Sequence, residues 1–228
     1  MKIAVIPARG GSKRIPRKNI KAFAGKPMIV YAIEAALNSG LFDRVLVSTD
    51  DPEIMKIAQQ YGAESPFIRP ADLADDHTPT VPVIAHAITS CEALGWDITV
   101  ACCIYPGVPF IKTDDLSKAW SLLKESNSGY AFPVTEFPSA IQRALKRSDE
   151  GTIKPFFPEH ELTRTQDLEM AYHDAGQFYW GKRDSWFDYP RIHSHGVGLP
   201  IPNWRVVDID TPDDWTRAEL FHRALSKK

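Results

Sequence analysis

The chain has 228 residues, of which 43% are hydrophobic and 25% charged, with a formal net charge of −2 at pH 7. This composition is ordinary for a globular protein with a substantial core, and it argues against non-specific nucleic-acid binding, which needs a basic face. No apolar run reaches the roughly 18–20 residues of a membrane span, and the amino-terminal pattern is not that of a secretory signal. Cys102 and Cys103 lie in an apolar run and predict buried reduced thiols. We therefore expect a cytoplasmic protein with neither a membrane nor a nucleic-acid partner.

The first twenty residues combine a short apolar run with a cationic loop that contains glycines. Residues 3–6 predict a buried parallel strand. Gly10, Gly11 and Ser12 then stand among five cations, which are Arg9, Lys13, Arg14, Arg17 and Lys18. Glycines let backbone N–H groups turn toward one point, and the cations surround that point with positive charge. This loop predicts a binding site for a polyanion such as a nucleoside triphosphate, with a basic surface loop as the alternative. It is neither a Walker loop nor a GxGxxG loop.

Strand and helix patterns alternate through the next hundred residues. Helices are predicted at residues 27–37, 51–62, 81–94 and 116–124, and strands at 42–50 and 98–104. Asp51 and Pro52 form a typical helix start. The alternation predicts an α/β fold whose mostly parallel sheet is flanked by helices on both faces, with ligands beyond the carboxyl ends of the strands. Asp50 lies at such an end, where a role in binding and a role in helix capping are equally open.

The pattern changes between residues 130 and 172, where prolines interrupt a mainly polar segment. It predicts an arm, inserted late in a single domain of residues 1–228, that needs another surface to pack against. A partner subunit is the simplest source of that surface, so we expect a homodimer. Asp75 and Asp76 are interpreted as solvated loop charges, and His193 and His195 as loop residues.

Two carboxylates near the carboxyl end form the second strong signal. Residues 205–210 predict a strand, and side chains two apart on a strand share a face, so Asp208 and Asp210 would point the same way. Two carboxylates beside a triphosphate suit Mg²⁺, which completes its shell with phosphate oxygens and water. A structural role for Asp208 remains the alternative. Thr211, Pro212 and Asp214 predict the capped start of a final helix.

These segments together resemble a known family. The stretches PARGGSKRIPRKN, VSTDD, FIRPADLADDHTPT, CCIYPGVPF, RTQDLEMAYHDAGQFYW and VVDIDTPDDW resemble the CMP-sugar synthetases that act on nonulosonic acids, along nearly the whole chain. The AYHDAGQFYW stretch is most similar to the pseudaminic acid cytidylyltransferases. The resemblance implies a Rossmann-like α/β fold with a dimerisation arm. It also implies that CTP and a nine-carbon acidic sugar react to CMP-sugar and pyrophosphate, for bacterial surface glycans or flagellin glycosylation.

The resemblance further implies roles for individual residues. The catalytic residues would be Arg9, Lys18 and Asp210. The nucleotide would be bound by Ala8, Gly10, Gly11, Ser12, Asn19, Arg69, Thr78 and Thr80. The sugar would be bound by Arg143, Arg164, His173 and Tyr179, with Arg164 reaching across a dimer. Mg²⁺ would be held by Asp208 and Asp210.

One position departs from the family pattern. Gly107 stands where these enzymes usually carry a small hydroxyl residue, so no side-chain contact is expected from it. The sequence leaves three alternatives open: a CMP-sialic or CMP-legionaminic acid synthetase, a CMP-Kdo synthetase, and an inactive nucleotide-binding module. It also leaves open dimer against tetramer, and whether a protein base or the metal activates the attacking hydroxyl.

Overall fold

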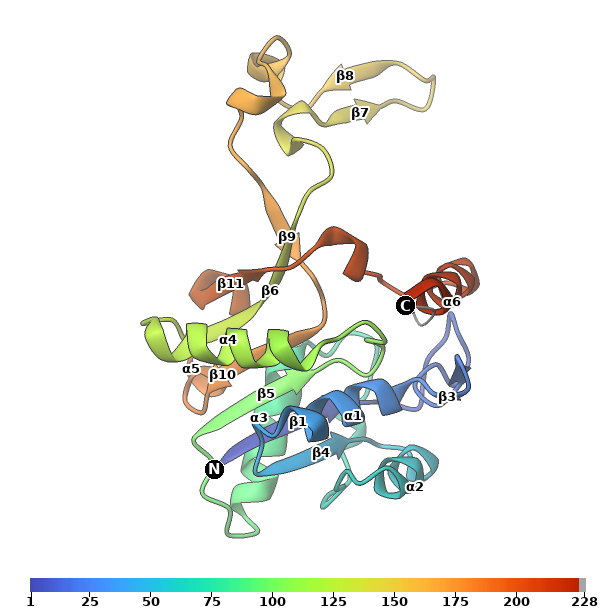
Figure 1. The fold of residues 1–228 in the computed structure, drawn as a ribbon, viewed down its shortest axis with the longest axis vertical. Coiled ribbons are helices and arrows are strands. Elements are labelled where there is room, and N and C mark those ends of the chain that lie inside the picture. Colours follow the sequence, from blue (N-terminus) through green and yellow to red (C-terminus); the bar gives the residue numbers. More distant parts are fainter. Residues whose placement is uncertain (226–228) are drawn as a thin grey trace.

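A seven-stranded sheet forms the centre of the molecule (Figure 1). The computed structural model describes residues 1–225, so the last three residues of the expected 1–228 domain lie outside the described part. The strand order is β11-β6-β10-β5-β1-β4, with β9 paired to β6. The strands are β1 (Lys2–Pro7), β4 (Arg44–Ser48), β5 (Val100–Ile104), β6 (Tyr130–Glu136), β9 (Tyr172–Asp174), β10 (Phe178–Lys182) and β11 (Gly196–Pro200).

Five of the seven strands, β1, β4, β5, β6 and β11, point in the same direction. β1 pairs in parallel with both β4 and β5, and β11 pairs in parallel with β6. β10 lies between β5 and β6 and is antiparallel to both, and the short β9 is antiparallel to β6. The expected mostly parallel α/β sheet is therefore confirmed, with β9 and β10 as its antiparallel members.

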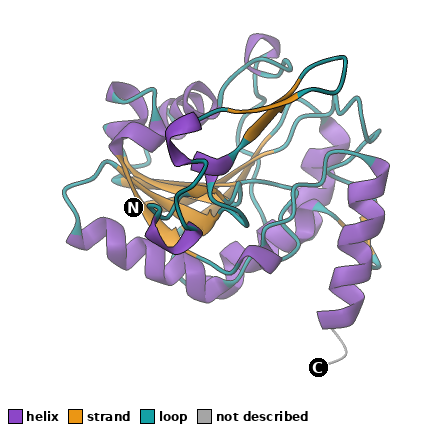
Figure 2. Ribbon diagram, turned by 90° about the horizontal axis from the view of Figure 1, so that it is seen from above, coloured by secondary structure: helices purple, strands orange, loops and turns teal. Residues whose placement is uncertain are grey.

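Each face of the sheet has its own core because successive side chains of β1 point to opposite faces. Ala4 and Ile6 pack into a cluster with α1 (Ile29–Ser39), α2 (Pro52–Gln60) and α4 (Thr113–Glu125). Ile3 and Val5 pack into a second cluster with α3 (Thr80–Glu92) and α5 (Ser185–Asp188). Figure 2 shows helices flanking the sheet. The cysteines are buried as expected, and burial raises the pKa of the Cys91 thiol to about 12.

Local signals set the helix starts as predicted. The Asp51 carboxylate caps α2 by accepting hydrogen bonds from the N–H groups of Glu53 and Ile54, and Pro52 occupies the first turn. The final helix α6 (Pro212–Leu225) begins with a reciprocal pair: Thr211 N donates to Asp214 Oδ2, and Asp214 N donates to Thr211 Oγ1. None of the helices in residues 1–225 has both the length and the apolar character needed to span a bilayer.

The predicted strand at residues 205–210 is wrong. The chain forms the 3₁₀ helix η6 (Asn203–Arg205) and then runs to residue 210 without pairing to the sheet. Its apolar residue Ile209 is buried against Phe23 and Trp215, in a third cluster beneath α6. The alternation of apolar and polar residues therefore arises because Val207 and Ile209 pack into a small side cluster. The edge of the sheet is formed by β11 instead.

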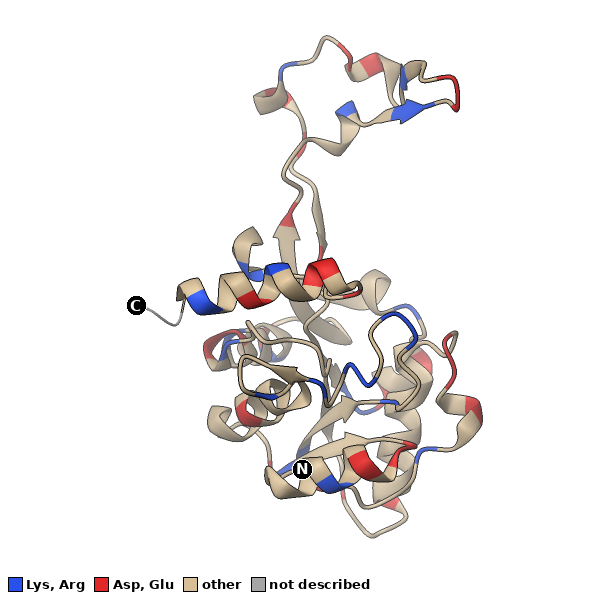
Figure 3. Ribbon diagram, turned by 90° about the vertical axis from the view of Figure 1, so that its right-hand side faces the viewer, with Lys and Arg blue, Asp and Glu red and all other residues tan. Residues whose placement is uncertain are grey.

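A long arm projects from the body between β6 and β9 (Figure 1). Residues 130–136 and 172, at the ends of the expected 130–172 insertion, belong to sheet strands, so the projecting part is 137–171. Its tip carries an antiparallel pair, and both signs of charge lie along it (Figure 3). The arm's elements are η2 (Ile141–Arg143), β7 (Leu145–Arg147), β8 (Ile153–Pro155), η3 (Pro158–His160) and η4 (Thr165–Asp167). The remaining short elements are β2 (Ala22–Phe23), β3 (Lys26–Pro27), η1 (Ala71–Leu73) and η5 (Ile192–His195).

A buried ion pair anchors the segment that follows β11. Arg205 and Asp115 are 6% and 5% exposed, and the Arg205 guanidinium pairs with both carboxylate oxygens of Asp115 in the first turn of α4. Gln177 Nε2 also donates to the Arg205 carbonyl oxygen at 3.0 Å. These contacts fix the point from which the chain continues to Asp208 and Asp210.

Removing one partner of this pair leaves an uncompensated charge in the interior. We predict that Asp115→Ala lowers the free energy of unfolding by about 3–5 kcal/mol, as measured by urea denaturation. The double variant Asp115→Leu with Arg205→Met removes both charges and should lose less stability than Asp115→Ala alone. A double variant that is the less stable of the two would contradict this account.

Candidate active site

A cavity of about 910 Å³ opens beyond the carboxyl ends of β1 and β5. It brings together segments that are far apart in the sequence: the loop after β1, the loop before α3, the turn after β5, the end of β9 and the segment before α6. Ligands of open α/β sheets bind at this edge of the fold. Ten of the predicted site residues line the cavity, which are Arg9, Ser12, Lys18, Asn19, Arg69, Thr78, Thr80, His173, Asp208 and Asp210.

The other predicted residues lie elsewhere. Ala8 is fully buried beneath the loop, and Gly10 and Gly11 are within it without lining the cavity. Tyr179 is buried behind the cavity wall. Arg143 and Arg164 are on the arm, where Arg164 pairs with Asp167 and Arg143 donates to Thr165 Oγ1 at 3.4 Å. Within one chain these two arginines do not join the site.

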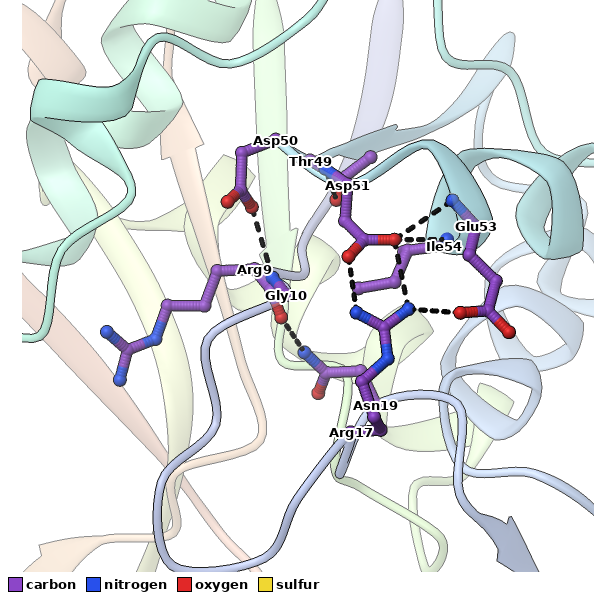
Figure 4. A network of polar contacts seen from close by, with 9 residues as sticks. All are labelled: Arg9, Gly10, Arg17, Asn19, Thr49, Asp50, Asp51, Glu53 and Ile54. Atoms are coloured by element: carbon purple, nitrogen blue, oxygen red, sulfur yellow. Dashed lines mark hydrogen bonds and ion pairs between the residues drawn. The ribbon is translucent and has the colours of Figure 1, made fainter.

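The loop after β1 is tied down by polar contacts with the segment after β4 (Figure 4). Gly10 N donates to Asp50 Oδ1 at 3.1 Å, and Asn19 Nδ2 donates to the Arg9 carbonyl oxygen at 2.9 Å. A Cβ atom at Gly10 would lie 2.5 Å from Asp51 Oδ2, so only glycine fits this approach. Asp51 is thus the helix cap, while Asp50 holds the backbone of the glycine loop.

Four loop cations converge on two carboxylates across the cavity. Asp76 pairs with Arg9 at 2.5 Å and also with Lys13, and these contacts lower the pKa of the Asp76 carboxyl. Asp210 pairs with Arg14 at 2.8 Å and with Lys18 at 3.4 Å. Asp76 is an exposed loop charge, as interpreted from the sequence, and it also pairs with cations of the glycine loop. No local sequence pattern predicts the pairing of Asp76 with Arg9 and Lys13, because it joins loops that follow two different strands.

Arg69 is a buried arginine, and two of its side-chain nitrogens have no hydrogen-bond partner in residues 1–225. Its side chain lines the cavity and the residue is 4% exposed, but its Nε and Nη2 atoms have no hydrogen-bond partner among the described residues. Burial lowers the pKa of the Arg69 guanidinium, and the nearby Asp50 charge opposes that shift. A buried, unpartnered donor costs free energy unless a ligand satisfies it. Arg69 therefore offers two nitrogen donors, Nε and Nη2, beside the cavity.

A polar cluster centred on Asp174 forms another wall. Asp174 Oδ2 accepts from Tyr179 Oη at 2.8 Å and contacts His193 Nε2 at 2.7 Å, while Asp174 Oδ1 accepts from Gly176 N at 2.7 Å. Burial raises the pKa of the Tyr179 hydroxyl, so it stays a donor. From the sequence, roles were expected for His173 and Tyr179, and His193 was interpreted as a loop residue; the contacts of Asp174 with Tyr179 and His193 were not expected. The polar stretch 172–174 before a strand was the available signal.

Asp208 and Asp210 both line the cavity, although they do not share a strand face. Partial burial in the cleft and the neighbouring Asp210 raise the pKa of Asp208. No group of three or more His, Cys, Asp or Glu in residues 1–225 is arranged to hold a metal by itself. Two carboxylates fit Mg²⁺, which takes one or two of them and fills its shell with phosphate oxygens and water.

Comparison with known proteins identifies the family. A model of the cytidylyltransferase family matches residues 3–193. The chain belongs to this family. Its members are nucleotidyltransferases, so the enzyme class inferred from the sequence is confirmed. The pseudaminic acid cytidylyltransferase of Campylobacter jejuni is 41% identical over 222 residues, which cover 97% of this chain and 96% of that protein.

This cytidylyltransferase is also similar to a more distant relative and to a solved structure. The CMP-N,N'-diacetyllegionaminic acid synthase of Legionella pneumophila is 30% identical, covering 95% of this chain and 94% of that one. The solved structure of a CMP:2-keto-3-deoxy-manno-octonic acid synthetase complexed with CTP superposes with a TM-score of 0.72, at 17% identity, and covers 98% of this chain and 99% of that one. That structure supports the fold.

The unpartnered state of Arg69 gives a stability prediction for this cytidylyltransferase. We expect Arg69→Met to leave the free energy of unfolding unchanged or to raise it by about 1 kcal/mol, because a desolvated, unpaired charge is removed. Arg205→Met is the matched control, since Arg205 is equally buried but paired, and it should destabilise. Urea denaturation of both variants decides the matter. Equal destabilisation would mean that Arg69 has a structural partner.

Proposed function

We propose that this enzyme transfers the cytidylyl group of CTP to pseudaminic acid, giving the CMP-sugar and pyrophosphate. The observation that carries the proposal is the single cavity that unites the cationic loop, Arg69 and the Asp208–Asp210 pair. The substrate assignment rests on the 41% identity to the Campylobacter jejuni protein over nearly the full length of both chains. We also infer that the enzyme works in the cytoplasm, where thiols remain reduced.

The reaction needs positioning and charge stabilisation more than covalent chemistry. The anomeric hydroxyl of the sugar attacks the α-phosphorus in line with the departing pyrophosphate, and negative charge builds on the leaving group. Arg9 and Lys18 enter the cavity from the glycine loop and would bind the phosphate oxygens, offsetting that charge. Ser12 and Asn19 line the same wall of the cavity. To bind phosphate, Arg9 exchanges its contact with Asp76, and Lys18 its contact with Asp210.

Asp208 and Asp210 would hold Mg²⁺ against the phosphates. Bound there, Mg²⁺ would neutralise phosphate charge and act as a Lewis acid. Asp208 and Asp210 lie on an irregular segment outside the sheet. Asp210 pairs with both Arg14 and Lys18, and Asp208 is exposed. The raised pKa of Asp208, caused by burial and by the Asp210 charge, fits a pair of carboxylates that gains from a shared cation.

Other walls of the cavity suit the two organic parts of the substrates. Arg69 offers its unpaired N–H groups to the nucleotide, beside the hydroxyls of Thr78 and Thr80. The sugar would lie against His173 and the Asp174 carboxylate, whose position is fixed by Tyr179. A Cβ atom at position 107 would lie 3.4 Å from Lys18 Cε, which is ordinary van der Waals contact, so a small side chain would also fit beside that lysine.

The arm supports a homodimer. Its exposed side chains include large apolar residues in an isolated hairpin and its flanks, which a monomer rarely leaves in water. These are Leu145, Ile153, Phe156, Phe157, Leu162 and Met170. Docking on a second subunit would bury them and would bring Arg143 and Arg164 toward the partner's cavity, where a guanidinium suits a sugar carboxylate.

Substrate identity and residue roles are tested by pyrophosphate release from CTP and Mg²⁺ with pseudaminic, legionaminic, neuraminic and Kdo acids in parallel. We expect turnover with pseudaminic acid above all others. Asp210→Asn should lower kcat at least about 100-fold while the circular dichroism spectrum is unchanged. Arg9→Ala should raise the KM for CTP about tenfold or more, without a like effect on the sugar.

Asp213→Asn is the matched control for this panel, because Asp213 is in the first turn of α6 and does not line the cavity. It should keep full turnover. Preferred use of another acid would move the assignment to that substrate, and full activity of Asp210→Asn would refute the proposed metal site. No pyrophosphate with any acid would favour a nucleotide-binding module without turnover.

The dimer proposal is tested on the arm itself. Phe156→Glu combined with Leu162→Glu, which is 97% exposed, should convert the dimer to a monomer in light scattering and lower turnover. Leu220→Glu is the control, since Leu220 is an exposed leucine on α6, outside the arm. A wild-type protein that is monomeric at micromolar concentration would refute the dimer.

A further inference from the structure

We infer that Arg17 is a positioning residue that fixes the shape of the phosphate-binding loop through a forked contact with Asp51. The inference rests on the proposed function, because it takes the loop after β1 to be the part that binds the phosphates of CTP. Arg17 itself does not line the cavity, whereas Arg14, Lys18 and Asn19 on either side of it do. Its effect on CTP therefore passes through the loop.

The fork joins the end of the loop to the start of α2 (Figure 4). Arg17 Nη2 donates to Asp51 Oδ1 at 3.0 Å, and Arg17 Nη1 pairs with Asp51 Oδ2. A second carboxylate, Glu53 Oε2, accepts from Nη2 at 2.6 Å. Such bidentate, charge-assisted pairs fix orientation as well as distance. The contacts hold the pKa of the Asp51 carboxyl at about 2, chiefly through the hydrogen bond from Arg17.

The Asp51 carboxylate is also the surface on which Gly10 rests. A Cβ atom at Gly10 would lie 2.5 Å from Asp51 Oδ2, the oxygen that pairs with Arg17 Nη1. The next residue back, Asp50, binds the Gly10 N–H group. A fixed Asp51 therefore holds both ends of the loop. It holds the end at Gly10 by close packing and the end at Lys18 through its contact with Arg17.

The backbone at Arg17 directs neighbouring side chains apart. Its φ of 56° lies in the left-handed region, which is uncommon for residues other than glycine, asparagine and aspartate. The turn is closed by hydrogen bonds from Ile20 N and Lys21 N to the Arg17 carbonyl oxygen, at 3.0 and 2.9 Å. It sends the Arg17 side chain to α2 while Lys18 enters the cavity. An unfavourable conformation kept at this place is consistent with a side chain held for its function.

Three variants separate this role from its alternatives. Arg17→Asn removes the fork but tolerates the left-handed backbone, Arg17→Lys keeps the charge without the fork, and Asp51→Asn keeps a capping oxygen while weakening the fork. Arg183→Ala is the matched control, because Arg183 forms a forked pair with Glu92 of similar exposure, outside the cavity lining. Each protein is compared with wild type by CTP titration calorimetry with Mg²⁺, by the KM values for CTP and sugar, and by hydrogen exchange of residues 9–19 without ligand.

We expect Arg17→Asn to raise the Kd and the KM for CTP about tenfold, with the KM for the sugar within about twofold of wild type. Amides of residues 9–19 should exchange faster, and Arg17→Lys should recover only part of the affinity. Asp51→Asn should weaken CTP binding to a similar extent. The double variant Arg17→Asn with Asp51→Asn should bind CTP no more weakly than Arg17→Asn alone, because both changes break the same contact. Arg183→Ala should match wild type in every measurement.

Several results would overturn the inference. If Arg17 contacted phosphate directly, Asp51→Asn would free it and leave CTP binding equal or tighter. Full recovery in Arg17→Lys would show that charge alone suffices. Unchanged exchange of residues 9–19 in Arg17→Asn would refute the loop-fixing role by itself. Because that exchange is measured without ligand, it tests Arg17 even if the wild-type protein fails to bind CTP, a failure that would instead refute the proposed function.

Discussion

The convergence of like charges at the end of β1 is the constraint on which this molecule depends. Arg9, Lys13, Arg14 and Lys18 face one cavity, and the protein balances them with Asp76 and Asp210. These pairs are partly exposed, so each adds little stability alone. These carboxylates compete with a ligand: a polyanion that enters the cavity must replace Asp76 and Asp210 as the partner of the cations. Affinity for a triphosphate is then a difference between two sets of ion pairs, which favours binding that can be reversed when pyrophosphate leaves.

A rigid sheet makes this charge balance possible. β1 lies between β4 and β5 in parallel register and is buried on both faces, so the loop that leaves it starts from a fixed point. The loop is then tied to the end of β4 and the segment after it at three places: Ala8 N donates to the Ser48 carbonyl oxygen, Gly10 N donates to Asp50, and Arg17 pairs with Asp51. The core and the backbone contacts thus hold the loop in place against the repulsion between its cations. The side chains that face the cavity remain available to a ligand.

Local physics explains which parts of this arrangement the sequence predicted. The buried strand at residues 3–6, the caps of α2 and α6 and the cationic glycine loop depend on neighbours within a few residues, and all appear as expected. The strand at 205–210 failed because its alternation served a small cluster beneath α6. The contacts of Asp76 with the loop cations and of Arg17 with Asp51 were not predicted, for one reason. Each joins loops that follow different strands, and the sequence carries no record of which loops meet.

The irregular path of residues 206–210 has a consequence for the acid pair. On a strand, Asp208 and Asp210 would share a face and a similar environment. Here Asp210 contacts Arg14 and Lys18, whereas Asp208 forms no ion pair within the described residues and its pKa is raised by burial and by Asp210. The two carboxylates therefore have different surroundings: Asp210 is paired with two cations of the glycine loop, and Asp208 faces the cavity without such a pair in residues 1–225. The anchor at Arg205 and the burial of Ile209 hold both residues on this path, so the difference between the acids follows from the fold itself.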